Sequence, residues 1–238
     1  MAGEDSGRRV RGLLLESAAV IVSILIAFAL DAAWDNRELG RELEQDLASV
    51  AAEVQTNIQA AGTHIALAER IASSSSEILG VLRSAPDGTP VPVVDTLIWW
   101  QTMTPTYEPS LGAIEAVAAS GRMSAIEDRE LSRRLASLSS RIEDAVEEEY
   151  EAQSYFEAVQ APRLFAHLDL SELHYLTDSF VGAAMSEPLE SRQSLSHPNS
   201  AEVRSAIEYR RYLYLEAVAS LRDLVTELEE LQALLAAR

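Results

Sequence analysis

The chain has 238 residues, and its 38 acidic residues against 19 basic ones give a formal net charge of −19. This balance argues against a nucleic-acid partner, because there is no surplus of basic side chains to displace counterions from phosphates. The absence of cysteine and lysine excludes disulfides, thiolate metal sites, cysteine nucleophiles and Schiff-base chemistry.

A transmembrane helix is predicted over residues 13–34, behind a polar tail over residues 1–12. Its centre, residues 17–30, carries no charged side chain. As an α-helix, residues 13–34 extend roughly 32 Å, which is enough to cross a hydrocarbon layer of about 30 Å. Trp34 then falls at the membrane interface, where tryptophan is enriched.

Two other interpretations of this segment stay open. One is a buried helix of a soluble protein, although such a helix is rarely apolar on all sides. The other is a cleaved signal peptide, since arginines precede the apolar run and the small residues Ala27 and Ala29 resemble a cleavage site. Glu16 argues against a signal peptide, because it interrupts the apolar run.

Flanking arginines predict the orientation of the span. Arg8, Arg9 and Arg11 precede the span, and Arg37 and Arg41 follow it. This slight excess favours a cytoplasmic N-terminus, because arginine and lysine are enriched on the cytoplasmic side. The prediction is a single-pass protein of the bacterial inner (cytoplasmic) membrane whose main domain is periplasmic.

One side of the predicted span differs from the other. At about 100° per residue, six residues fall within about 60° of one line along the helix. They are Glu16, Ala19, Ser23, Ala27, Asp31 and Trp34. The small residues would let another helix approach closely, and carboxylates within membranes seldom face lipid. We interpret these six residues as a helix-packing stripe; the alternative is chance in an alanine-rich chain.

Residues 35–238 are predicted to form a helical bundle. The first long helix, residues 38–83, repeats mostly apolar residues at spacings of four and three, as a packing seam does. The seam consists of Leu43, Leu47, Val50, Val54, Asn57, Ala61, His64, Ala68, Ile71, Ser75, Ile78 and Leu82. The helix is expected to continue from the membrane span, with a bend or break near Gly40 or Gly62.

The remaining helices are predicted as two short and two long ones, with a further short helix near residues 171–176. The short helices cover residues 93–103 and 111–120, and the long helices cover residues 128–161 and 200–236. The seam of helix 128–161 consists of Leu131, Leu135, Leu138, Ile142, Ala145, Glu149, Ala152, Phe156 and Val159. The seam of helix 200–236 consists of Tyr214, Val218, Leu221, Val225, Leu228 and Leu235. No strand pattern is visible. The predicted fold class is therefore all-α, with a transmembrane helix followed by an antiparallel helical bundle or coiled coil.

No pattern in the sequence points to catalysis, a cofactor or a metal. The histidines lack the spacing of a metal site, and His64 in the seam is interpreted as a packed core histidine. The carboxylates of residues 147–151 point around the helix and are interpreted as a solvated face. Trp99 and Trp100 have two readings, either a partner-facing patch or a part of the bundle core.

Two stretches resemble an uncharacterised bacterial family of single-pass membrane proteins with a helical extramembrane domain. The first runs from Glu16 to Asn36, with an Ile-Leu-Ile-Ala core followed by Asp31 and Trp34. The second runs from Thr104-Pro105-Thr106 to the Ser120-Gly121 turn and the helix start near Asp128. The resemblance implies the single-pass topology and lends no activity.

These observations predict a non-enzymatic, membrane-anchored accessory subunit. It would pack its stripe and bundle against other subunits of a larger membrane complex; a bioenergetic assembly, photosynthetic or respiratory, is one host. An alternative is an envelope protein that forms homo-oligomers through the same heptads. A third hypothesis is a ligand sensor or enzyme that uses the Trp99-Trp100 loop.

Overall fold

The computed structural model describes the backbone of residues 3–166, 168–177 and 190–238, and within these ranges the side chains from Val20 onward. Its elements in chain order are α1 (Gly3–Arg83), β1 (Pro90–Val94), α2 (Asp95–Thr102), α3 (Gly112–Ala119), η1 (Arg122–Ala125), α4 (Arg129–Tyr155), η2 (Phe156–Gln160), α5 (Ala161–Leu164), η3 (Leu170–Leu173), β2 (Ser194–Pro198) and α7 (Ala201–Ala236). The described chain is predominantly helical, which confirms the all-α class.

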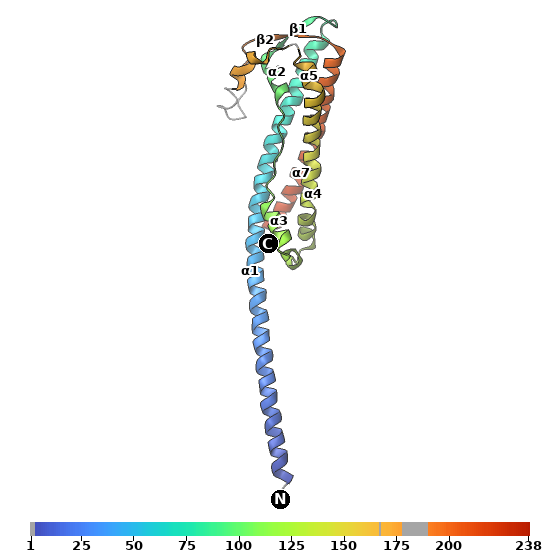
Figure 1. The fold of residues 1–238 in the computed structure, drawn as a ribbon. Helices are drawn as coiled ribbons and strands as arrows, with labels where there is room; N and C mark the ends of the chain where they lie inside the picture. The colour runs from blue at the N-terminus through green and yellow to red at the C-terminus, as the bar shows by residue number, and fades with distance from the viewer. Residues whose placement is uncertain (1–2, 167, 178–189) are drawn as a thin grey trace.

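Helix α1 is the axis of the molecule. Its 81 residues extend about 120 Å, and only its C-terminal half joins the bundle, while the N-terminal half stands clear of it (Figure 1). The break expected at Gly40 or Gly62 is wrong, because α1 is continuous through both. A glycine inside a helix costs only about 1 kcal/mol, and Leu43 and Ala61 beside them are held in the core.

The bundle consists of α1, α4 and α7. Helix α7 runs antiparallel to both others, as the ion pairs Glu69–Arg222 with Arg83–Glu208 indicate for α1. Helices α1 and α4 are parallel, so the predicted antiparallel arrangement is wrong for this pair. The reason is the connection between them: after α2, residues 103–111 run back along the bundle without regular structure, and α4 starts again at the lower end (Figure 1).

The predicted seams form the core. Every α1 seam position is buried except His64, which is partly exposed. The α4 seam is buried from Leu131 to Ala152, and in α7 Tyr214 and Leu221 are among its buried positions. Phe156, Val159, Val225 and Leu235 of the predicted seams are only partly buried. The heptad prediction is therefore confirmed for most positions, and each of these seams is covered by other elements of the same chain.

The ends of the long helices follow local capping rules. Asp128 accepts hydrogen bonds from the backbone of Glu130 and Leu131 at the start of α4, and Ser200 accepts one from Val203 at the start of α7. Beyond Tyr155 the predicted helix 128–161 passes through the single π-helical turn η2 before α5.

A two-stranded ribbon lies at the end of the bundle farthest from the N-terminus (Figure 1). β1 and β2 pair antiparallel, with Val91 opposite His197 and Val93 opposite Leu195, and these four residues are buried. The expectation of no strands is therefore wrong. The strands are short and proline-containing, which hides their period of two, and their pairing joins segments about a hundred residues apart.

Candidate functional site

The N-terminal half of α1 exposes a continuous apolar surface. Its large apolar side chains between residues 20 and 34 are each 49–70% exposed, namely Val20, Ile21, Val22, Ile24, Leu25, Ile26, Phe28, Leu30 and Trp34. Consecutive residues point in different directions around a helix, so this surface surrounds the helix. Exposed apolar patches of this kind mark interaction sites with membranes or proteins.

Within the described residues, no helix is both long and apolar enough to cross a membrane. The side chains of residues 13–19, which open the predicted span, lie outside the described residues. The same holds for Glu16 and Ala19 of the helix-packing stripe. The other stripe residues, Ser23, Ala27, Asp31 and Trp34, lie on the exposed part of α1, and the structure brings no other segment of the described chain over them.

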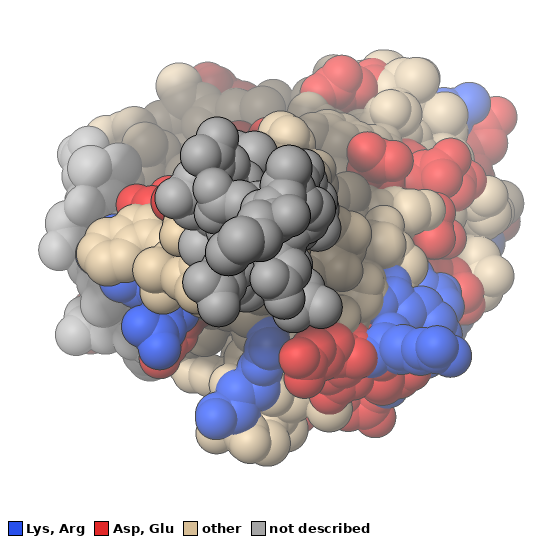
Figure 2. All heavy atoms as spheres, turned by 90° about the horizontal axis from the view of Figure 1, so that it is seen from below, with Lys and Arg blue, Asp and Glu red and all other residues tan. Residues whose placement is uncertain are grey.

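The base of the bundle, where α1 emerges, is charged. Figure 2 looks along α1 from the N-terminal end and shows acidic and basic side chains intermixed around it. Arg122 pairs there with Asp46 at 2.6 Å and with Glu42 at 3.2 Å. The end of the bundle nearest the exposed apolar surface of α1 therefore carries ion-paired charges.

A second candidate site consists of the buried polar side chains that contact residues 103–111. Residues 103–111, which we call the strap, run along the bundle without helix or strand. Buried backbone polar groups without regular structure need side-chain partners. Asn57 supplies two of these contacts, since its amide nitrogen donates to the carbonyl of Ser110 at 2.7 Å and its amide oxygen accepts from the backbone nitrogen of Ser110 at 2.9 Å.

Glu149 holds the middle of the strap. It is 1% exposed, and its Oε2 accepts a hydrogen bond from the backbone nitrogen of Tyr107. Its Oε1 lies 3.8 Å from Nδ1 of His64. The interpretation of residues 147–151 as a solvated face is therefore wrong for Glu149, because the strap fills the seam opposite it. His64, as expected for a packed histidine, lies edge-to-face against Tyr107.

Arg210 is fully buried and holds the start of the strap. Its guanidinium donates to the carbonyl oxygens of Gln101, at 2.7 Å, and of Met103. Its Cζ lies 4.4 Å from the ring centroid of Phe156 and 5.0 Å from that of Tyr214. Burial lowers the pKa of Arg210 below its ordinary value. Carbonyl dipoles and aromatic faces thus surround a charge that has no ion pair with a carboxylate of the described chain.

A cluster of buried amides lies beside Arg210. Together with Asn57, Glu149 and Arg210 it forms what we call the polar layer. The side chain of Gln101 donates to the hydroxyls of Ser74, at 2.6 Å, and Ser75, at 3.1 Å, and accepts from Gln160 at 2.8 Å. The π-helical turn η2 presents Gln160 to this cluster. The polar layer from Asn57 to Gln160 therefore serves to hold the strap and its neighbours in place.

Asp95 forms a similar anchor for residues 191–193 beside the ribbon. It is buried and accepts from the hydroxyls of Tyr175 and Ser191 and from the backbone nitrogens of Arg192 and Gln193. Burial raises its pKa and these hydrogen bonds lower it, so that the net pKa lies below the ordinary value. The carboxylate is therefore ionised near neutral pH and positions a loop.

The two tryptophans Trp99 and Trp100 differ in burial. Trp100 is 6% exposed and packs with Ile71 and Tyr214, with Arg70 over its ring at 5.7 Å. Trp99 is partly buried against the core cluster under the ribbon. Trp100 is therefore part of the bundle core, and the prediction of a partner-facing patch is wrong for this residue.

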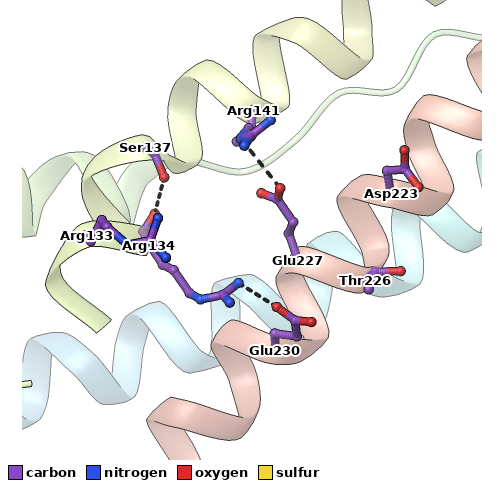
Figure 3. A pocket seen from close by; sticks show the side chains of 8 residues that line it. All are labelled: Arg133, Arg134, Ser137, Arg141, Asp223, Thr226, Glu227 and Glu230. Atoms are coloured by element: carbon purple, nitrogen blue, oxygen red, sulfur yellow. Dashed lines mark hydrogen bonds and ion pairs between the residues drawn. The ribbon is translucent and has the colours of Figure 1, made fainter. Parts of the chain in front are cut away.

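A groove between α4 and α7 gathers three arginines and three carboxylates (Figure 3). Arg134 pairs with Glu230 at 2.7 Å, and Arg141 with Glu227 at 3.5 Å. Arg133 pairs with Glu130 on its own helix at 2.6 Å. Each arginine that lines the groove already pairs with a carboxylate, so the groove is an ion-pair ladder and offers no unpaired arginine to an anionic ligand.

The described part of the chain shows no cluster of side chains typical of a metal site. No group of three or more histidine, aspartate or glutamate side chains there could hold a metal ion. Of the four histidines, His167 lies outside the described residues, and His197 bonds to the backbone carbonyls of Pro198 and Leu164.

The burial of Tyr107 predicts that the stability of the fold depends on pH. Burial and the nearby carboxylate of Glu149 raise the pKa of Tyr107 to about 12 from 10.0. Between these values the unfolded chain loses the phenolic proton and the folded chain keeps it, so stability is complete below pH 10 and falls as the pH rises to 12. Two pKa units correspond to about 2.7 kcal/mol. Tyr107→Phe should make the melting temperature less sensitive to pH across this window, and equal slopes for both proteins would contradict the assignment.

The comparisons identify no relative. No family model, curated protein or solved structure matches this chain.

Proposed function

We propose that this chain is a non-enzymatic, membrane-anchored accessory subunit that packs against a larger membrane complex and stabilises it. The observation that carries the proposal is the apolar surface around α1 from Val20 to Leu30. A lone helix that is apolar on every side is unstable in water, whereas lipid chains and neighbouring membrane helices would cover it. In the sequence, apolar residues continue back to Leu13 and are interrupted by Glu16.

The continuity of α1 gives the anchor a mechanical role. The first core contact of the bundle, Leu43, follows Trp34 by about 13 Å of helix. The bundle would therefore sit at the bilayer surface, and a rigid helix would fix its rotation relative to the membrane segment. This geometry suits a subunit that braces other proteins at a defined height.

The alternative, self-association through the α1 heptads, has less support. Leu43, Val50 and Leu82 of that seam are buried within the chain, so pairing there would require the bundle to open. Detergent purification with mass spectrometry separates the two proposals. Heterologous membrane proteins at fixed stoichiometry favour the accessory subunit, and recovery of this chain alone favours self-association.

Two leucine substitutions in the proposed membrane segment test the helix-packing stripe. Ser23→Leu should weaken association with the partner subunit, because bulk on the stripe blocks close helix approach, while membrane insertion persists. Val22→Leu, on the opposite side, is the matched control. Close packing contributes about 0.6–2 kcal/mol per interhelical contact, so association should weaken tenfold or more. Equal co-purification of the partner with both variants would reduce this segment to an anchor.

A further inference from the structure

A histidine and a buried glutamate face each other in the middle of the bundle. Nδ1 of His64 lies 3.8 Å from Oε1 of Glu149, which is within ion-pair distance but longer than a hydrogen bond. Both atoms are buried, and within the described residues neither has a hydrogen-bond partner. Buried polar atoms in proteins are normally paired, so two such atoms that face each other call for a physical explanation.

Glu149 connects three parts of the molecule. It belongs to α4, its Oε2 accepts a hydrogen bond from the backbone nitrogen of Tyr107 in the strap, and its Oε1 faces His64 of α1. Tyr107 also contacts α1 directly, because its ring lies edge-to-face on His64 with the centroids 5.8 Å apart, and its hydroxyl donates to the carbonyl of Asn57 at 3.3 Å. The charge state of this one carboxylate therefore affects the strap and the helices on both sides of it.

An ionised Glu149 needs a compensating charge. Its side chain is not exposed to solvent, and a single hydrogen bond from a backbone amide does not offset the cost of burying a carboxylate. Among the residues that the structure describes, His64 is the one basic side chain at ion-pair distance from it. The charge on Glu149 is thus compensated only when His64 carries a proton.

The other titratable groups beside the pair keep their charge state near neutral pH. In the strap, burial and the carboxylate of Glu149 raise the pKa of Tyr107 to about 12. On α7, burial raises the pKa of Tyr214, although the nearby Arg210 lowers it. Both phenols therefore stay neutral, and Arg210 stays protonated as arginines in proteins do. Proton exchange in this layer near neutral pH is confined to His64 and Glu149.

We propose that His64 and Glu149 form a proton-linked latch on the strap. While the pair holds one proton, the imidazolium and the carboxylate compensate each other, and Glu149 keeps its hydrogen bond to Tyr107. When the pH rises and this proton leaves, an uncompensated carboxylate remains in the core, and the strap opens so that water reaches it. The side chain of His64 is 20% exposed, so the proton enters and leaves through the histidine.

The latch controls only the middle of the strap. The two ends are held by groups that do not titrate near neutral pH, since Arg210 donates to the carbonyl of Met103 and Asn57 bonds to the backbone of Ser110. Opening between these two points would remove the link between α1 and α4 that runs through Glu149. The latch lies within the bundle, so it does not depend on the proposed membrane anchor.

Hydrogen exchange of the full chain, purified in detergent, tests the latch. At the amide of Tyr107, the exchange rate divided by the intrinsic rate at the same pH should rise at least about tenfold between about pH 6 and about pH 9, as histidine loses its charge. Exchange at the C2 carbon of His64 reports the protonation of the imidazole in the same sample, and both profiles should share one midpoint. A constant ratio at Tyr107, or midpoints that differ by more than about one pH unit, would overturn the proposal.

Two substitutions distinguish the latch from a contact that only supports the fold. Glu149→Gln keeps the shape of the side chain and still offers an acceptor to Tyr107 and a donor to His64, so the strap should stay closed at both pH values. His174→Gln, at an exposed histidine beyond η3, is the matched control and should keep the pH dependence of the parent. A strap that still opens with pH in Glu149→Gln, or one that no longer does so in His174→Gln, would contradict the latch. If Glu149→Gln does not fold, the two midpoints in the parent decide.

Discussion

Leu221→Asp is expected to lower the free energy of unfolding by about 4 kcal/mol or more, because it removes a buried leucine and buries an unpaired carboxylate. Leu221 is fully buried among the seams of all three long helices. Chemical denaturation of the purified chain measures the change.

The matched control lies two turns further along α7. Glu229 is exposed, so Glu229→Ala should change stability by less than about 0.5 kcal/mol. Equal shifts for the two variants would mean that the bundle is not packed in this register.

Arg210→Leu is expected to destabilise the bundle by about 2–4 kcal/mol. Leucine relieves the burial of a charge, which by itself favours the variant. The carbonyl oxygen of Gln101 loses the guanidinium donor, however, and that of Met103 keeps only the hydroxyl of Tyr214, at 3.4 Å. Because an unpaired buried group costs about 1–3 kcal/mol, the loss at these two carbonyls is expected to be the larger effect.

One control variant and one further measurement isolate this effect. Arg211 pairs with Glu208 on the same helix, so Arg211→Leu should cost less than about 1 kcal/mol. Hydrogen exchange should accelerate at the strap amides of Tyr107 and Ser110 in Arg210→Leu and not in Arg211→Leu. If Arg210→Leu is as stable as the parent, the arginine does not hold the strap.

The seams could be predicted because helical periodicity is local. Leu43, Leu131 and Leu221 each open or continue a run of spacings of three and four, and burial of that side follows from the helix itself. The caps Asp128 and Ser200 are local in the same way, since a cap acts on the next few residues. The caps and seams thus fix the length and inner side of each helix.

The strap and the ribbon could not be predicted, because their partners are distant in sequence. Glu149 looks like its acidic neighbours until Tyr107 is placed opposite it. One signal was present: Asn57 interrupts the apolar seam, and a buried amide needs a partner that a seam of leucines does not supply. The parallel relation of α1 and α4 depends on the strap, so it was missed with it.

The central claim, a bundle held outside the membrane by α1, is tested by labelling Ser196→Cys in intact spheroplasts. Ser196 is exposed on β2 at the far end of the bundle. An impermeant maleimide should label the chain before lysis, and the labelled chain should remain with washed spheroplasts, which release unanchored periplasmic proteins. Labelling only after lysis would contradict the orientation, and loss of the chain in the wash would contradict the anchor.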